Sequence, residues 1–387
     1  MTSTTRALPS LGSVEGELAR VFAAKRRLAA AYGPWFEQLW GTAAAKATGG
    51  KLLRPRLFLA ALDAIEAPEA TGENDPGRGR ADARPEAEGD AAMRVAVALE
   101  LLHYSFLLHD DVIDGDAVRR GEPNLIAVLA GENPPGTAEP AHADGDAPVQ
   151  PPDARRLHWA RSCGILMGDL LLAEVHQLLA GLDGPAGVRR RLLALLDHAV
   201  TESVAGEQLD VGLGDGVIDP DLAGVLRMSR LKTATYTFEL PLRAAAAVAG
   251  ADPRLDAVLA QAGRHLGLAF QLQDDLLSTF GDPSAHGKDP YSDLREGKET
   301  VVIAHARMTS AWPSIEPLFG SPALTPEGAS EMRSLLVDCG AESFAESLVD
   351  DQLRALHELL AERDDLVPAR LAAVVSALST RLEGRTA

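Results

Sequence analysis

Apolar residues recur every three or four positions along most of the chain, which is the pattern of α-helices with a buried face. Long alternating segments of Val, Ile and Thr, which would indicate strands, are missing from the sequence. The helical spacing is clearest at residues 14–40, 157–182, 189–206 and 240–251, and two or three further helices are expected within 300–381. The pattern predicts an all-α fold, and we expect residues 1–387 to form one domain, since helical enzymes can be large single units.

Two stretches interrupt this helical pattern, residues 67–90 and 131–153. Both are rich in Gly, Pro, Ala and acidic residues and have too little apolar surface to pack into a core. We expect them to be mobile surface insertions without a chemical role.

One strongly apolar helix ends in three carboxylates, Asp110, Asp111 and Asp114. Asp110 and Asp114 lie four residues apart and share one helix face, while Leu102 and Phe106 recur at helical spacing behind them. Clustered carboxylates repel one another and are costly to desolvate unless a cation lies between them. The sequence therefore predicts a Mg²⁺ site at this helix end, because a few carboxylates that share a phosphate are its usual ligands. The alternative is a solvated acidic helix end.

A second apolar helical run delivers Asp274 and Asp275, followed by the glycine-lysine pairs that contain Lys288 and Lys298. Because two distant helices carry the same combination of acids followed by bases, we expect two metal-binding walls that face one cavity. Two other Asp pairs lack following basic residues and are expected on the surface, at positions 350–351 and 364–365.

Further cations stand where a phosphate could bind. Gly49 and Gly50 precede a helix start that carries Lys51 and Arg54, which is a reasonable phosphate cradle, although cations at helix starts are also common surface residues. Lys232 is a lone cation on an otherwise apolar helix, and it could equally be a surface lysine whose stem is buried.

The net charge of −19 argues against nucleic acid or an anionic membrane surface as a partner. Cys163 and Cys339 are isolated, form no metal-ligand spacing and indicate a reducing compartment. We find no signal peptide and no apolar run that approaches the roughly 20 residues of a spanning helix. The expectation is a cytoplasmic protein without a membrane span.

Taken together, these motifs resemble those of the trans-isoprenyl diphosphate synthases, the polyprenyl synthetase family. The resemblance runs from about Thr42 to Thr300 and depends on motifs that occur in the family's order. These motifs are Gly49-Gly50-Lys51-Leu-Leu-Arg54-Pro55, Asp110-Asp111-Val-Ile-Asp114 with Arg119-Arg120-Gly121, Gly168-Asp169, Gly206-Glu-Gln-Leu-Asp210, Lys232-Thr233 and Phe270-Gln271-Leu-Gln-Asp274-Asp275.

The resemblance implies a helical bundle around a deep central cavity, the isoprenoid synthase type I fold, and a homodimer. It also implies three Mg²⁺ ions on an allylic diphosphate, two held by Asp110 and Asp114 and the third by Asp274, with Asp111 and Asp275 completing the two motifs. One departure is Ser278, where the family usually has a third Asp in the second motif. We expect this change to weaken metal binding without abolishing activity.

The remaining roles also follow from the resemblance. The allylic diphosphate would contact Arg119, Lys232, Lys288 and Lys298. Isopentenyl diphosphate would bind Lys51, Arg54, His103 and Arg120. The alternative for His103 is a core histidine whose hydrogen bonds are made within the protein. Thr233 and Gln271 would shield a carbocation with their dipoles.

The length of the product depends on residues one to three turns before Asp110, if the growing chain runs back along that helix. Each turn advances about 5.4 Å, close to one isoprene unit. Phe106 is bulky, Ser105 small and Leu102 of medium size, so we expect a C15 to C20 product and favour geranylgeranyl diphosphate. Phe106 could instead be plain core packing.

Other function classes fit the sequence less well. A farnesyl or longer-chain synthase remains an alternative, and a class I terpene cyclase would not need Lys51, Arg54 and Arg120. A regulatory partner would be expected to have lost the first acidic cluster, and a scaffolding bundle does not explain the two sets of basic residues.

Overall fold

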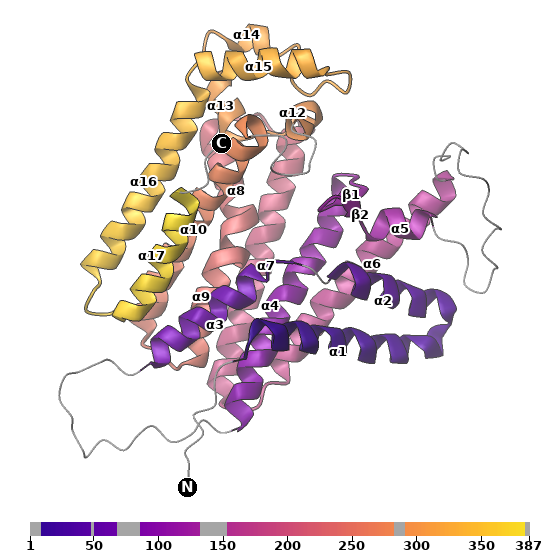
Figure 1. Ribbon diagram of the computed structural model, residues 1–387, viewed down its shortest axis with the longest axis vertical. Helices are drawn as coiled ribbons and strands as arrows, with labels where there is room; N and C mark the ends of the chain where they lie inside the picture. The colour runs from indigo at the N-terminus through magenta and orange to yellow at the C-terminus, as the bar shows by residue number, and fades with distance from the viewer. Residues whose placement is uncertain (1–8, 48–49, 68–85, 132–152, 282–290, 384–387) are drawn as a thin grey trace. The chain divides into compact units, whose positions relative to one another are not determined.

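The computed structural model describes residues 9–47, 50–67, 86–131, 153–281 and 291–383. Most of these residues are helical, and the only strands among them are two of two residues each, so the predicted all-α fold is confirmed. They group into two compact units (Figure 1). Among the described residues, the first unit holds 9–56 and 86–185, and the second unit holds 57–67 and 186–383, with the gaps given above.

The first unit is built around α4 and α6, which pack against each other, with α1, α2 and α5 beside them (Figure 1). Apolar side chains of both helices are almost fully buried, as the apolar periodicity of the sequence predicts. They include Leu101 and Leu102 of α4 and Met167 and Leu171 of α6. Its elements are α1 (Leu11–Ala29), the 3₁₀ turn η1 (Ala30–Tyr32), α2 (Pro34–Ala47), the start of α3 (Leu53–Glu66), α4 (Glu86–Ile113), β1 (Val118–Arg119), β2 (Glu122–Pro123), α5 (Leu125–Gly131) and α6 (Ala154–Ala180).

In the second unit α10 packs against η2, α9 and α16 (Figure 1). The element η2 is a ten-residue π-helix, a rare conformation that often occurs at functional sites. Its close packing depends on Gly267 of α10, where an added Cβ would lie 2.2 Å from the Cβ of Ala234. The elements are the rest of α3, α7 (Ala186–Gly214), α8 (Leu222–Ser229), η2 (Arg230–Glu239), α9 (Leu240–Val248), α10 (Pro253–Phe280), α12 (Ser292–Glu296), α13 (Val301–Arg307), α14 (Trp312–Ile315), α15 (Pro326–Asp338), α16 (Ala341–Glu362) and α17 (Ala369–Glu383).

Several element boundaries differ from the prediction. The expected helix over 14–40 is divided at Gly33, whose φ of 108° is the conformation that glycine tolerates best. Residues 300–381 form five helices rather than two or three, because prolines such as Pro313 and Pro326 start new helices instead of continuing old ones. The predicted insertions lie mostly outside the described residues, although α4 already begins at Glu86.

The expectation of one domain over the whole chain remains a prediction. Two described helical segments, Ala91–Ile113 and Ala154–Ala180, are long and apolar enough to cross a membrane, so the sequence estimate that no run approaches this length was wrong. Most of the first segment is buried, as in the core helix of a globular protein. The absence of a membrane span likewise remains a prediction.

Candidate active site

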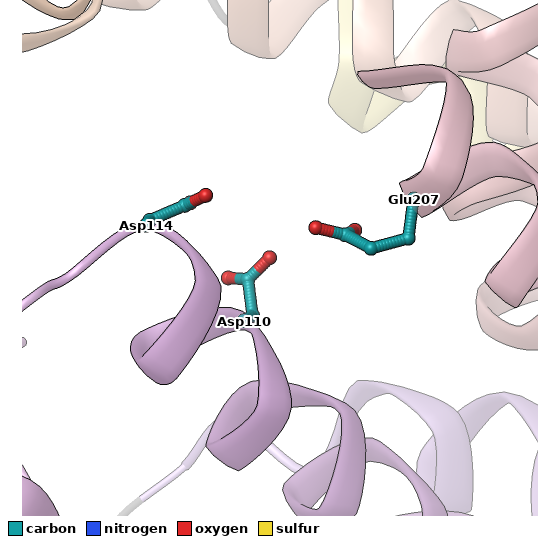
Figure 2. Close-up of side chains that lie close together, drawn as sticks. All are labelled: Asp110, Asp114 and Glu207. Atoms are coloured by element: carbon teal, nitrogen blue, oxygen red, sulfur yellow. The ribbon is translucent and has the colours of Figure 1, made fainter. Parts of the chain in front are cut away.

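The end of α4 presents Asp110 and Asp114 on the same side of the helix (Figure 2). One carboxylate oxygen of each lies within 4.8 Å of the other, and the side chains are half-buried and exposed, respectively. Carboxylate oxygens at this spacing fit a hard divalent cation such as Mg²⁺. Glu207, also drawn in Figure 2, belongs to α7 of the second unit.

Asp111 does not share the exposure of its neighbours, since it is 2% exposed. Its Oδ1 accepts hydrogen bonds from Nε and Nη2 of Arg119 at 2.8 and 2.5 Å, and Arg119 Nη2 also donates to Asp110 Oδ2 at 3.2 Å. Burial raises the pKa of Asp111, and the hydrogen bonds and charge of Arg119 oppose that rise. Asp111 therefore anchors the arginine rather than projecting with the candidate metal ligands.

A hairpin after α4 presents the two neighbouring arginines. Val118 pairs with Pro123 and Arg119 with Glu122, which leaves Arg120 and Gly121 as a two-residue turn. Both turn residues have positive φ, 57° and 77°, as a type I′ turn requires. Such a φ is unfavourable for arginine, and strain of this kind is found where the conformation serves a function.

Arg119 and Arg120 lie close to different partners. Arg119 contacts the two aspartates, whereas the guanidinium of Arg120 lies at Gly50, where an added Cβ would be 3.1 Å from its Nη2. The same Cβ would lie 3.4 Å from Oε1 of Glu100. Glycine at position 50 thus leaves room for the guanidinium of Arg120 and the carboxylate of Glu100, which explains why the sequence has a glycine there.

Beside these groups lies a cavity of about 260 Å³ within the first unit. His103, Arg119 and Arg120 line it, as does buried Glu100. Its remaining lining residues come from α2, α4, β2, α5 and the link between the last two, and include Lys46, Tyr104, Asp111, Glu122 and Asn124. The cavity combines cationic, neutral and acidic groups at one place.

Burial and the charges around this cavity keep the imidazole ring of His103 neutral. Its pKa lies well below the ordinary value because burial and the positive charges of Arg54, Arg120 and Arg119 disfavour the protonated ring. Burial raises the pKa of Glu100, while Arg54 and Arg120 lower it. Arg54 is itself 7% exposed, and Lys51 is exposed. The structure thus brings His103, Arg120 and Arg54 into one electrostatic neighbourhood.

The three residues predicted to control chain length have different surroundings. Ser105 is completely buried and its hydroxyl donates to the carbonyl oxygen of Gly168 at 2.9 Å, which joins α4 to α6. Leu102 is 1% exposed, and Phe106 is half-buried. Of the three, Phe106 is therefore the residue whose side chain extends from the packed interior.

In the second unit, Lys232 stands near the start of the π-helix. Its Nζ donates to Oδ2 of Asp210 at 2.6 Å and lies 3.0 Å from Oε2 of Glu207. Gly206, just before Glu207, has no room for a side chain, because a Cβ there would lie 2.3 Å from the backbone nitrogen of Lys232. Lys232 is therefore a partly buried, paired cation rather than a solvated surface lysine.

A short hydrogen-bonded chain links three other predicted residues of this unit. The hydroxyl of Thr233 donates to Oε1 of Gln271 at 2.6 Å, and Nε2 of Gln271 donates to Oδ1 of Asp275 at 2.9 Å. Burial raises the pKa of Asp275 to about 8, and the charge of Asp274 adds to the rise. Asp274 itself is exposed. Lys298 is half-buried, and Lys288 lies outside the described residues.

Sequence reasoning did not assign roles to Glu207, Asp210, Glu100 or Tyr104. The first two were visible in the Gly206-Glu-Gln-Leu-Asp210 motif, and the structure pairs both with Lys232 of the π-helix η2. Glu100 and Tyr104 carry no sequence signal beyond their place on α4. That the acidic clusters of the two units face one cavity remains a prediction.

Comparisons with known proteins agree with the family that the sequence motifs resemble. The family model described as Polyprenyl synthetase matches residues 37–318, a range that includes the candidate residues from Lys51 to Lys298. The geranylfarnesyl diphosphate synthase of Aeropyrum pernix is 30% identical over 304 residues, covering 77% of this chain and 79% of that protein. The geranylgeranyl diphosphate synthase of Mycobacterium tuberculosis is 31% identical over 274 residues, covering 69% and 67%.

Among solved structures, the chain is similar to geranylgeranyl pyrophosphate synthase from Corynebacterium glutamicum, crystallised in complex with isoprenyl diphosphate and magnesium. The TM-score is 0.79 with 27% sequence identity, and the match covers 97% of this chain and 98% of that one.

Proposed function

We propose that this chain, which belongs to the polyprenyl synthetase family and is a prenyltransferase, makes a short-chain all-trans prenyl diphosphate. The family uses isopentenyl diphosphate and an allylic diphosphate as substrates and depends on Mg²⁺. The proposed reaction is their head-to-tail (1′-4) condensation. The observation that carries the proposal is the end of α4, where Asp110 and Asp114 project together and Arg119 lies beside them.

The allylic diphosphate would be held at Asp110, Asp114 and Asp274 through three Mg²⁺ ions. Bound Mg²⁺ supplies positive charge that makes diphosphate a better leaving group without proton transfer. Arg119, Lys232, Lys298 and Lys288 would bind the same diphosphate and stabilise its growing negative charge.

Loss of the diphosphate leaves an allylic carbocation, which Thr233 and Gln271 would stabilise with their dipoles. Their mutual hydrogen bond fixes the orientation of both groups and supports this role. The double bond of isopentenyl diphosphate then attacks the cation, and a proton is lost to the released diphosphate. The aliphatic side chains of α4 and α10 would exclude water, which would otherwise trap the cation.

Isopentenyl diphosphate would bind Lys51, Arg54, His103 and Arg120. The 260 Å³ cavity lined by His103 and Arg120 supports this assignment, since a polyanion there would meet positive charge from several sides. The pKa of His103 is depressed by burial and by those charges, so the neutral ring can offer one N–H to a phosphate oxygen.

We propose geranylgeranyl diphosphate as the product, with farnesyl or longer chains as the alternatives. Substituting Phe106→Ala should lengthen the product by one or more isoprene units, because it removes the half-buried bulky group one turn before Asp110. Product mass is the measurement. Phe36→Ala, which changes an aromatic side chain of α2 that meets the ring of Tyr32 edge-on, is the matched control. An unchanged product distribution from Phe106→Ala would show that this residue only packs the core.

The decisive assay supplies the pure protein with Mg²⁺, isopentenyl diphosphate and each of three allylic primers, and measures product mass. Product that forms without isopentenyl diphosphate would identify a terpene cyclase instead. We also propose a cytoplasmic homodimer, which sedimentation and cell fractionation can test.

A further inference from the structure

Two buried side-chain oxygens in the wall of the cavity have no hydrogen-bond partner among the residues that the structure describes. They are Oε2 of Glu100 and the hydroxyl of Tyr104, one helical turn apart on α4. Tyr104 is only 8% exposed. Buried tyrosine hydroxyls are normally hydrogen-bonded. A hydroxyl without a partner in a cavity wall therefore indicates that a bound ligand makes the missing hydrogen bond.

The hydroxyl of Tyr104 is held in place by the packing of its ring. The ring meets that of Phe22 edge-on, with 6.4 Å between centroids and an interplanar angle of 66°, and Phe22 is itself 1% exposed. A packed ring fixes the position of the phenolic oxygen, while the hydroxyl hydrogen can still rotate toward an acceptor. Its position on the wall is thus set before any ligand arrives.

The chemistry of the two oxygens differs. Burial and the charge of Asp111 raise the pKa of Tyr104 far above its ordinary value, so the phenol keeps its proton and can donate it to a hydrogen bond. Glu100 between Arg54 and Arg120 is an acceptor when ionised and would repel a phosphate oxygen. The ligand that fits Tyr104 is therefore an anion with acceptor oxygens, held by His103 and Arg120 in the same cavity.

We propose that the hydroxyl of Tyr104 donates a hydrogen bond to a diphosphate oxygen of isopentenyl diphosphate bound in this cavity. The inference rests on the proposed function, because that function supplies the ligand. It adds a binding residue that no motif of the chain contains.

The test is Tyr104→Phe, which removes one oxygen and keeps the ring packed against Phe22. Calorimetric binding of isopentenyl diphosphate, measured with chelator so that no metal-dependent site contributes, should weaken by roughly ten- to a hundredfold. In the complete assay the KM for isopentenyl diphosphate should rise, while the KM for the allylic substrate stays within about twofold. Tyr32→Phe, at an 80% exposed tyrosine, is the matched control and should change neither.

Thermal stability without substrate separates binding from a structural role. Because the hydroxyl has no partner among the described residues, the melting temperature of Tyr104→Phe should stay the same or rise. Unchanged binding of isopentenyl diphosphate, or a lower melting temperature with both KM values raised together, would overturn the proposal. Wild-type protein that fails to condense any primer would instead refute the proposed function, which the Tyr104 variant does not test.

Discussion

The aspartate pair at the end of α4 and the pair on α10 differ in what holds their buried member. In each pair one carboxylate is nearly inaccessible, Asp111 or Asp275, while its neighbour reaches outward. Asp111 is bound by the guanidinium of Arg119, whereas Asp275 accepts its hydrogen bond from the neutral amide of Gln271. In both units the Asp-Asp motif thus consists of one buried, anchoring acid and one more accessible acid, which is half-buried at Asp110 and exposed at Asp274.

The difference in partner has an electrostatic consequence. Burial raises the pKa of both anchoring acids, but only Arg119 brings a full positive charge to offset it. Asp275, with an amide partner and Asp274 next to it, reaches a pKa of about 8. The comparison indicates that the buried acid of the first unit, Asp111, forms an ion pair with Arg119. The buried acid of the second unit, Asp275, is largely protonated and neutral at pH 7.

The largest expected effect comes from Asp110, the more accessible member of the first pair. Asp110→Asn should lower kcat by roughly 10²- to 10³-fold, because it removes a proposed metal ligand while keeping the size of the side chain. Steady-state assays across a Mg²⁺ titration would measure it. Asp350→Asn, in an exposed pair without following basic residues, is the control and should retain full activity. Equal activity in both variants would remove Asp110 from the site.

The buried members should differ in stability. Asp111→Asn should cost about 3 kcal/mol in the free energy of unfolding, because it leaves Arg119 partly buried without its main counter-charge. Asp275→Asn should stay within about 1 kcal/mol near neutral pH, since an amide can still accept from Gln271. Urea denaturation in chelator measures both. Similar losses in the two variants would mean that the type of partner is unimportant.

The pH dependence of stability should sharpen the contrast. The folded pKa of Asp275, about 8, lies above its unfolded value of about 4, so between these limits the folded state binds more protons. The free energy of unfolding should therefore fall as the pH rises from about 4 to 8, and Asp275→Asn should remove that part of the slope. The difference between wild-type and variant denaturation curves at several pH values isolates the effect. Parallel curves would show that Asp275 is ionised throughout.

Much of this arrangement follows from local sequence rules. Spacing alone places Asp110 and Asp114 on one face, and the apolar period around Leu102 predicts the buried helix that carries them. These features depend on neighbours in the chain, which is why the sequence reveals them.

Other features depend on partners that are distant in the sequence. Nothing near Ser105 predicts its bond to Gly168, and nothing near Lys232 predicts either the π-helix or the bond to Asp210. The apparent equality of the two aspartates in each pair was also misleading, because burial of Asp111 and Asp275 is decided by α-helix packing rather than by the motif. Tertiary contacts of this kind have no periodic signature.

The smallest expected effect concerns the position where the two acidic helices differ in sequence. Asp114 lies four residues after Asp110, and the equivalent spacing after Asp274 brings Ser278, whose hydroxyl donates to the carbonyl oxygen of Asp275 at 3.0 Å. Substituting Ser278→Asp would place a second carboxylate on the face of Asp274, as in the first cluster.

We expect Ser278→Asp to lower the Mg²⁺ concentration for half-maximal activity by a few fold, with kcat within about twofold, because added charge strengthens a weak site without changing the chemistry. Ser278→Asn, which has a similar size and no charge, is the matched control. If the aspartate and asparagine variants require the same Mg²⁺ concentration as the wild type, the metal-binding role of α10 does not extend beyond Asp274.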